Sequence, residues 1–287
     1  MISRKTYFFA DLHADKEAFL KSLDFCDDER ALYLIGGDCL DKGPSNLELL
    51  EEIEKLSRRV EVKILAGNHD IRMLMVLLGW EDQKNPQLEK IFAPERFKKR
   101  ITPFLKECGG IEKAKQMFLD PKGKFGWFFK SLNLLHSDNE FLFVHAGISD
   151  QFMDEITSKT EKFLNTRFQD ALRDFSKLFD FYYGPCGSSF RTKYRDKRDF
   201  PLTSVGAECL EKLGIKYIVH GHNNQVHGHQ LKTHVGIKHL LCDCSVDSGT
   251  RQKIGLDKKS GFAVAIFDNE KSIIKCHSAE RYLEINT

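Results

Sequence analysis

Short runs of apolar residues recur along this 287-residue chain, and each run ends at a glycine or a polar side chain. Runs of this length, bounded by turn-forming residues, are typical of buried β-strands. Five stretches fit the description, at residues 7–10, 31–35, 60–65, 141–144 and 217–219. Helical patterns separate the first three runs, at residues 15–26 and 45–58. Strands that alternate with helices predict an α/β fold.

Residues 81–138 interrupt this alternation, and we expect them to form a mostly helical cap inserted before the fourth strand. The stretch carries two basic clusters and the aromatic residues Trp127, Phe128 and Phe129. Two interpretations stay open. The cap either forms part of a substrate groove or is an ordinary helical layer with solvated charges.

Two later segments complete the expected fold. Residues 262–267 and 273–274 are expected to be closing strands that complete a second sheet. Residues 159–183 favour helices, with an apolar stripe that we expect in the core. The stripe consists of Phe163, Phe168, Leu172, Phe175 and Leu178. With 41% hydrophobic residues, the chain can bury one large core, so we expect a single domain over residues 1–287.

Charge, hydropathy and cysteine spacing exclude several classes of protein. The net charge of +2 is too small to favour nucleic acid as the main partner. No apolar run reaches the roughly 18–20 residues of a membrane span, and residues 1–5 lead into the first strand without the apolar stretch of a signal peptide. The eight cysteines are scattered, without a Cys-x-x-Cys pair, as is typical of reduced thiols. We therefore expect a cytoplasmic protein with no membrane partner.

Polar motifs stand at the ends of the apolar runs, where open α/β sheets bind ligands. They occupy residues 11–13, 37–43, 67–70 and 221–222, together with His145. Each motif alone also fits a turn, a helix cap or a half-buried histidine. In combination they supply oxygen and imidazole donors and a carboxylate that can bridge two ions. Two metal ions about 3.5–4 Å apart can activate water and neutralise a transferring phosphoryl group, so the motifs predict a two-metal phosphoesterase.

The motifs resemble those of the calcineurin-like metallophosphoesterases, and within them the phosphoprotein phosphatase type, over roughly residues 5–225. The resemblance implies a metallophosphatase-like β-sandwich flanked by helices in four layers. It also implies two divalent metal ions, with Mn preferred and Fe or Zn possible, since mixed oxygen and imidazole ligands suit these metals better than Ca. The implied ligands are Asp11 and His13 for the first metal, Asp38 as the bridge, and Asn68, His145 and His222 for the second.

The same resemblance implies the catalytic and substrate-binding residues. His69, in the Gly-Asn-His motif, would be the general acid, and Asp41 would orient it and raise its basicity. Lys42 and Arg191 would bind the phosphate, and Arg195 is the next candidate for the role of Arg191. The reaction would be hydrolysis of a phosphate monoester by in-line attack of a metal-bridging hydroxide.

The chain departs from the family pattern at a few positions. Lys42 stands where arginine is usual, so the positive charge is kept but the bidentate fork is lost. Ala10 and Ala14 stand where glycine is common. Asn224 replaces the second histidine of a Gly-His-x-His motif, as in the phosphoprotein branch, and His220 is a weaker alternative to His222.

Three functions fit these motifs. The leading interpretation is a phosphatase that acts on phosphorylated protein. The second is a symmetrical dinucleoside tetraphosphate hydrolase, because residues 67–75 and 144–148 resemble that branch equally well. The third is a non-catalytic scaffold that binds phosphoproteins, which the intact set of ligand and acid positions disfavours. The expected partner is therefore a phosphorylated protein or a small phosphate ester such as a nucleotide.

Overall fold

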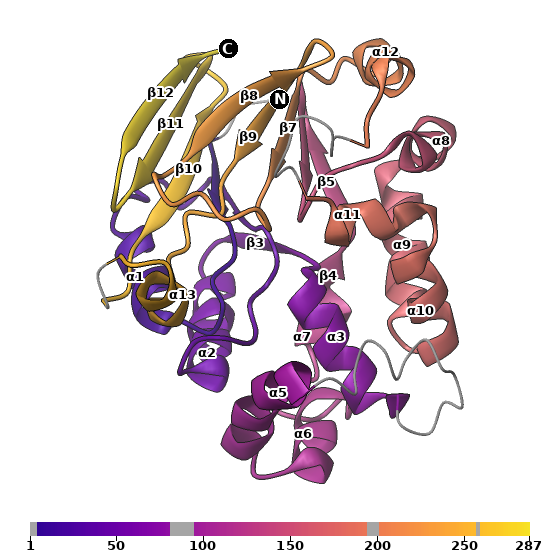
Figure 1. The fold of residues 1–287 in the computed structure, drawn as a ribbon, viewed down its shortest axis with the longest axis vertical. Coiled ribbons are helices and arrows are strands. Elements are labelled where there is room, and N and C mark those ends of the chain that lie inside the picture. The colour runs from indigo at the N-terminus through magenta and orange to yellow at the C-terminus, as the bar shows by residue number, and fades with distance from the viewer. Residues whose placement is uncertain (1–4, 81–94, 194–200, 257–258) are drawn as a thin grey trace.

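The computed structural model describes residues 5–80, 95–193, 201–256 and 259–287. Within them, two β-sheets stack face to face (Figure 1). The strands of the first sheet, from one edge to the other, are β12 (Tyr282–Asn286), β11 (Ile273–Ser278), β10 (Ala263–Asp268), β1 (Lys5–Phe9), β2 (Leu32–Ile35), β3 (Glu61–Leu65) and β4 (Leu132–Asn133). Those of the second sheet are β5 (Leu135–Asp138), β6 (Phe141–Val144), β7 (Tyr217–His220), β9 (Ile237–Leu241) and β8 (Gln230–His234).

Helices cover the outer faces of the two sheets (Figure 1). The helices α1 (Lys16–Leu23) and α2 (Asn46–Ser57) contribute buried residues to a core that also contains the outward-facing residues of β1 and β2. The helices beside the second sheet are α8 (Asp150–Ser158), α9 (Glu161–Ala171), α10 (Phe175–Tyr183), α11 (Ser188–Arg191) and α12 (Ser204–Lys212). The short helix α13 (Ser248–Lys253) precedes β10. The predicted sandwich flanked by helices is confirmed.

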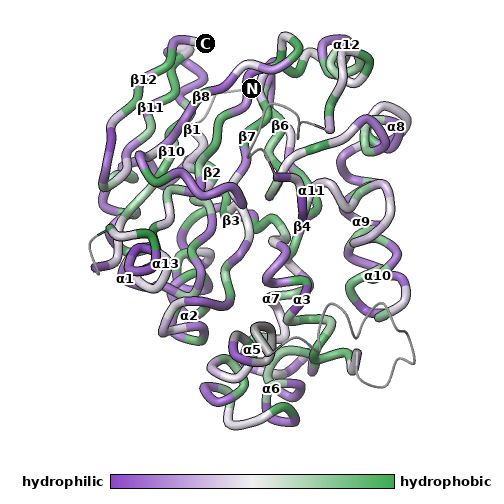
Figure 2. Tube along the Cα trace, viewed as in Figure 1, coloured by the Kyte–Doolittle hydropathy of each residue, from purple (hydrophilic) through white to green (hydrophobic). Residues whose placement is uncertain are grey.

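Successive residues of β1 face two different cores. Phe8 points between the sheets, where its ring centroid lies 5.6 Å from that of Phe143 on β6. Phe9 packs instead against Phe19 of α1, with ring centroids 5.6 Å apart. Because successive strand side chains point to opposite faces, a strand covered on both faces is apolar throughout. Figure 2 shows such hydrophobic stretches along the strands of both sheets.

The closing strands extend the first sheet, so our prediction that they complete a second sheet was wrong. β10 pairs antiparallel with β1, with Asp268 opposite Lys5, and β11 pairs antiparallel with β10. The apolar pattern of a strand records that both of its faces are buried, but it does not record which strand becomes its neighbour.

One residue of the predicted apolar stripe lies outside the core. Phe163 on α9 is 51% exposed, whereas Phe168, Leu172, Phe175 and Leu178 are buried. Phe168 follows Phe163 by five positions, which places them about 140° apart around a helix. Leu164, four residues before Phe168, takes the buried position instead.

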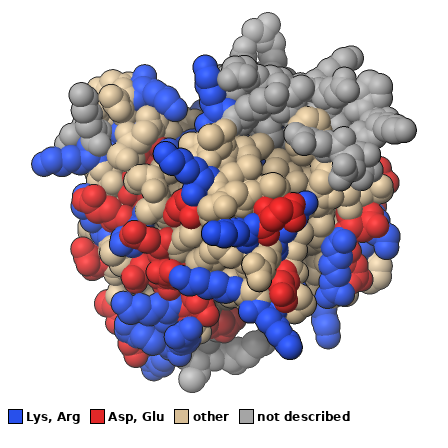
Figure 3. All heavy atoms as spheres, turned by 90° about the horizontal axis from the view of Figure 1, so that it is seen from below, with Lys and Arg blue, Asp and Glu red and all other residues tan. Residues whose placement is uncertain are grey.

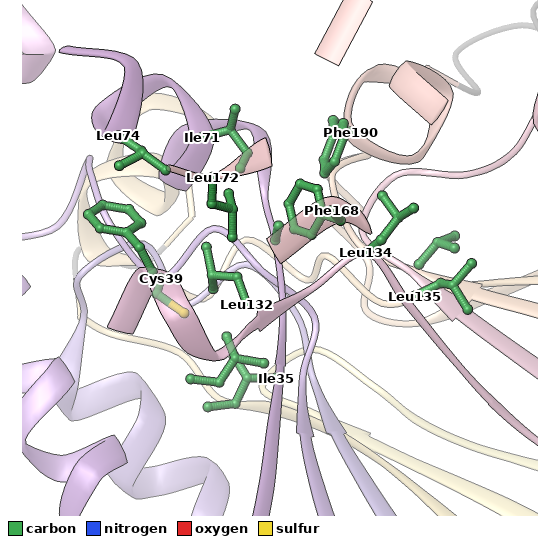
Figure 4. Packing of buried hydrophobic residues seen from close by; sticks show 14 of the residues in the cluster. Ile35, Cys39, Ile71, Leu74, Leu132, Leu134, Leu135, Phe168, Leu172 and Phe190 are labelled. Atoms are coloured by element: carbon green, nitrogen blue, oxygen red, sulfur yellow. The ribbon is translucent and has the colours of Figure 1, made fainter. Parts of the chain in front are cut away.

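The described part of the insertion contains three helices, α5 (Glu95–Cys108), α6 (Ile111–Phe118) and α7 (Phe128–Ser131). α5 packs against α2, and α6 packs against α3 (Asn68–Leu77). The last residues of the predicted cap form β4 and β5, which belong to the two sheets. Figure 4 shows the packing around α3, where Ile71 and Leu74 lie in the same hydrophobic cluster as Leu132 of β4.

The surface carries mixed charge. On the face seen in Figure 3, basic and acidic side chains are interspersed, in keeping with the small net charge. Across the described ranges, none of the helices has both the length and the apolar character needed to cross a bilayer.

Candidate metal centre

The carboxyl ends of neighbouring strands bring the predicted metal ligands to one edge of the sandwich. β1, β2 and β3 pair in parallel; the loops after β1 and β2 carry Asp11 and Asp38, and Asn68 is the first residue of α3, which follows β3. β6 and β7 also pair in parallel, and they lead into His145 and His222. Parallel neighbours end at the same edge, so residues far apart in the sequence meet there.

Asp38 lies at the centre of the cluster. Its Oδ2 is 3.6 Å from His13 Nε2 and 3.8 Å from His69 Nε2. Its other oxygen, Oδ1, is 3.5 Å from His145 Nε2. The two oxygens thus face two groups of donors, His13 with His69 on one side and His145 with His222 on the other, each within 4.8 Å of Asp38. A carboxylate between two donor groups is the arrangement that a bridging ligand requires.

Asp11 and Asn68 complete the same cluster. Asp11 Oδ1 lies 3.9 Å from His13 Nε2, and Asp11 Oδ2 accepts a 2.8 Å hydrogen bond from the backbone N–H of His222. Asn68 Oδ1 lies 3.2 Å from His145 Nε2. The structure therefore brings all six predicted ligand positions together, and their binding of metal stays a prediction.

The backbone of the site is held in unusual conformations. Asp11, His13, Asp38, Asp41 and His222 all have positive φ angles, between 46° and 73°. Residues other than glycine adopt this region at an energetic cost, and such strain clusters at functional sites.

Two glycines permit the close approach of neighbouring segments. A Cβ atom on Gly67 would lie 2.0 Å from the backbone nitrogen of Asp38. A Cβ atom on Gly221 would lie 1.8 Å from Asp11 Oδ2. The positions before Asn68 and His222 in the sequence motifs therefore require glycine, because any Cβ atom there would clash with Asp38 or Asp11.

The protonation states of the buried groups suit metal binding. Burial lowers the pKa values of His13, His145 and His222, which keeps the imidazoles neutral and their lone pairs available. Burial alone would raise the pKa of Asp38, but the neighbouring histidines and a lysine outweigh burial and hold this pKa well below its usual range. Asp38 is thus an anion at neutral pH.

Unpaired polar atoms within the cluster also fit a bound cation. Asp11 Oδ1 and His222 Nε2 are buried and have no hydrogen-bond partner among the described residues. Burial, together with the charges of Asp243 and Asp38, raises the pKa of Asp11, and a divalent ion would remove this repulsion. His145 places Nδ1 2.8 Å from the carbonyl oxygen of Gly36, so Nδ1–H donates to that carbonyl and Nε2 faces the cluster as an acceptor.

The predicted acid–base pair is formed. His69 Nδ1 lies 2.6 Å from Asp41 Oδ2, and both side chains are buried. The other imidazole nitrogen, Nε2, faces Asp38. The backbone N–H of Asp41 donates to Asn46 Oδ1 at 2.9 Å, which fixes the loop that carries the carboxylate.

The two predicted phosphate-binding residues lie in different places. Lys42 lines the cavity beside the cluster, and its Nζ contacts His13 Nε2. Arg191 is exposed on α11, and its guanidinium lies over the rings of Tyr182 and Tyr183, 5.3 and 4.8 Å from their centroids. It is not among the described residues that line the cavity, so its contact with phosphate stays a prediction. Arg195 lies outside the described residues.

A cavity of about 480 Å³ opens over the cluster. Several of its described lining residues were absent from our predictions: Arg72, Lys193, Asn223, Gln225 and Lys232. The sequence held one signal for Arg72, its position three residues after His69 and therefore on the same face of a helix, but it did not show that this face would line the cavity. The described part of the insertion contributes no lining residue, which favours its interpretation as an ordinary helical layer.

One further buried carboxylate lies near the cluster. Asp243 is buried close to Asp11 and Lys42, and burial raises its pKa to about 6; no motif in the sequence marked it.

A larger cavity of about 640 Å³ lies between α9 and α10, lined by residues such as Phe163, Arg167 and Phe181. None of the predicted site residues lines that second cavity, so the cavity over Asp38 is the candidate site.

Comparison with known proteins identifies related sequences. A family model described as calcineurin-like phosphoesterase matches residues 4–225. Two relatives named symmetrical bis(5'-nucleosyl)-tetraphosphatase are from Buchnera aphidicola, 38% identical over 82 residues, and Salmonella paratyphi C, 27% identical over 150 residues. The alignments cover 28% and 51% of this chain, and only 29% and 44% of the respective relatives.

Solved structures show the same fold. A cold-active protein-tyrosine phosphatase from a psychrophilic Shewanella species superimposes with a TM-score of 0.68 at 17% identity, covering 98% of this chain and 80% of that one. A protein serine/threonine phosphatase from Saccharomyces cerevisiae superimposes with a TM-score of 0.57 at 15% identity, covering 97% and 80% of the two chains. At these identities the likeness establishes the fold alone.

Proposed function

The chain belongs to the calcineurin-like phosphoesterase family and is a phosphoester hydrolase, and we propose that it cleaves dinucleoside tetraphosphates symmetrically. This is the second of the functions that the motifs allowed. The names of the sequence relatives favour it, and the alignments with them are partial.

The observation that carries the proposal is the charge of the cavity. Its described lining contains four cationic side chains, Lys42, Arg72, Lys193 and Lys232, and two carboxylates, Asp11 and Asp38. The carboxylates belong to the candidate metal centre, and the four cations line the cavity in which a substrate would bind. A chain of four phosphates carries more negative charge than one phosphate monoester, and charge-assisted contacts to phosphate are strong.

Two divalent ions, which we propose to be Mn, would be held by Asp11, His13, Asp38, Asn68, His145 and His222. When bound, such ions acidify water and neutralise charge on the phosphoryl group. The remaining chemistry falls to two residues of the chain. His69, which contacts Asp41 at 2.6 Å, would give a proton to the leaving oxygen, and Lys42, which lines the cavity, would contact the phosphate.

The test is a comparison of substrates with the purified, Mn-loaded protein. We expect diadenosine tetraphosphate to yield ADP as the sole nucleotide product, with a higher kcat/KM than phosphoserine and phosphotyrosine peptides. Release of phosphate from the peptides without cleavage of the tetraphosphate would instead establish the phosphoprotein phosphatase. Products other than two ADP molecules would overturn symmetrical cleavage. Metal analysis of the same preparation tests the choice of Mn.

A further inference from the structure

Arg72 occupies a distinctive place in the cavity. It lies on α3, one helical turn after His69, so both side chains project from the same face of the helix. Arg72 lines the cavity over the cluster. Its Nε is buried and has no hydrogen-bond partner among the described residues. A buried guanidinium N–H without a partner is costly, which indicates that a ligand supplies the acceptor.

A second unpaired group lies near this arginine. α10 packs against α3, and the hydroxyl of Tyr182 on α10 is buried without a hydrogen-bond partner in the described parts of the chain. Burial raises the pKa of Tyr182 to about 12, and the positive charge of Arg72 is the largest opposing influence. Both unpaired groups thus lie on helices that pack against each other.

The order of residues along α3 suggests what Arg72 contacts. His69 Nε2 faces Asp38, at 3.8 Å from Oδ2, and Arg72 lies one turn further along the helix from Asn68. A general acid stands beside the leaving oxygen. The next residue on that face can therefore reach the atoms to which the leaving oxygen is attached. In a serine phosphate these atoms are uncharged carbon, whereas in a phosphoanhydride they are a second, negatively charged phosphate.

We propose that Arg72 forms a subsite for the leaving phosphate and so selects phosphoanhydrides over phosphate monoesters. This inference rests on the proposed function. Water attacks one phosphorus atom, a new P–O bond forms, and the bond to the bridging oxygen breaks. The electron pair stays on the bridging oxygen of the leaving diphosphate, which takes a proton from His69. The proton that the attacking water releases passes to solvent, from which His69 is reprotonated. Arg72 holds the anionic oxygens of the leaving phosphate throughout.

The experiment measures inhibition of p-nitrophenyl phosphate hydrolysis by two probes in the metal-loaded, full-length protein. Inorganic phosphate occupies one phosphate position, whereas methylenediphosphonate, which cannot be hydrolysed, occupies two adjacent positions. We expect R72Q to raise the inhibition constant of methylenediphosphonate about tenfold, as expected for a lost hydrogen bond to a charged group. The inhibition constant of phosphate should change less than about threefold. R72K keeps the positive charge but loses the planar guanidinium, so its inhibition constant for methylenediphosphonate should lie between those of R72Q and the wild type.

The matched control is R173Q, which removes the same charge from an exposed position between α9 and α10. It should leave both inhibition constants unchanged. Equal weakening of the two probes in R72Q, or no weakening of either, would overturn the subsite. If melting curves show that R72Q does not fold, R72K carries the same test: it must weaken methylenediphosphonate more than phosphate.

The experiments distinguish failure of the Arg72 subsite from failure of the proposed substrate. Selective loss of methylenediphosphonate inhibition in a protein that does not cleave diadenosine tetraphosphate supports the subsite and refutes only the substrate. Cleavage of the tetraphosphate with equal kcat/KM in wild type, R72Q and R72K supports the substrate and refutes the subsite.

Discussion

His69 Nδ1 and Asp41 Oδ2 lie 2.6 Å apart, and both side chains are buried. The contact fixes the orientation of the imidazole and leaves Nε2 facing the candidate metal centre. A carboxylate behind an acid–base histidine stabilises the imidazolium and selects the tautomer. The pair therefore has the geometry of a proton donor and the residue that positions it.

The first prediction concerns this pair. We expect D41N to keep its metal content and to lose on the order of 10²-fold in kcat, at the lower end of what a general acid contributes. H69N should lose more activity on phenyl phosphate, whose leaving oxygen is the more basic, than on p-nitrophenyl phosphate. If Asp41 acts through His69, the double variant should be no slower than H69N. Additive losses would show that Asp41 has a separate role, and loss of metal in H69N would make His69 a ligand.

Glu107 links the insertion to the same pair. From the end of α5, its Oε2 accepts hydrogen bonds from the backbone N–H and the side-chain Nδ2 of Asn46, at 3.1 and 2.9 Å, and its Oε1 accepts from Leu47 N–H. Asn46 Oδ1 in turn accepts from Asp41 N–H. The carboxylate thus caps the first turn of α2, where free N–H groups attract negative charge.

The second prediction follows from this cap. E107A should lower the free energy of unfolding by about 1 kcal/mol, the typical loss when a helix cap is removed. Urea denaturation measures the change. The matched control is E112A, which removes an exposed glutamate from the neighbouring helix α6 and should change stability by less than about 0.5 kcal/mol. Equal effects of the two variants would contradict the capping role.

Gly67 supplies the third prediction. In G67A the new Cβ would lie 2.0 Å from the backbone nitrogen and 2.2 Å from Oδ1 of Asp38, so the bridging carboxylate must move. We expect G67A to lose bound metal and activity to nearly the same extent as D38N, which removes the bridging charge directly. Metal analysis and kcat measurements compare the two. A G67A protein with wild-type metal content would show that the loop can move without displacing Asp38.

The fourth prediction concerns stability below neutral pH. Burial lowers the pKa of His229 to about 3, whereas an unfolded histidine has a pKa of about 6.5. Between these values the unfolded chain binds the additional proton. His229 therefore contributes stability that is fully present above about pH 6.5 and is lost as the pH falls towards 3.

The size of the stability loss caused by His229 follows from the linkage between proton binding and unfolding. Lowering the pH from 7 to 5 should cost about 2 kcal/mol through this residue alone. Chemical denaturation of the metal-free protein at both pH values measures the loss, and H229Q should reduce it by that amount. H227Q is the control, since it alters a neighbouring histidine that is not fully buried. An identical pH dependence in the wild type and H229Q would contradict the prediction.

The sequence by itself determined the five strands that lead into the motifs, the order of the motifs and the residue types of the site, whereas β4, β5, β8, β9 and β12 were not predicted. Runs such as residues 141–144 are apolar because both faces of the strand are buried, and this local property is recorded in the chain. The motifs also predicted which side chains gather around Asp38, because parallel strands end at one edge.

Only the tertiary structure decided which segments became neighbours. The pairing of β10 with β1, the exposure of Phe163 and the hydrogen bonds of Glu107 to Asn46 depend on contacts between distant parts of the chain. Arg191 and Arg72 illustrate the limit most clearly. Both are basic residues near candidate motifs, yet the fold turns Arg191 onto two tyrosine rings and Arg72 into the cavity. The direction of a side chain depends on how its helix packs, and a local sequence pattern does not contain that information.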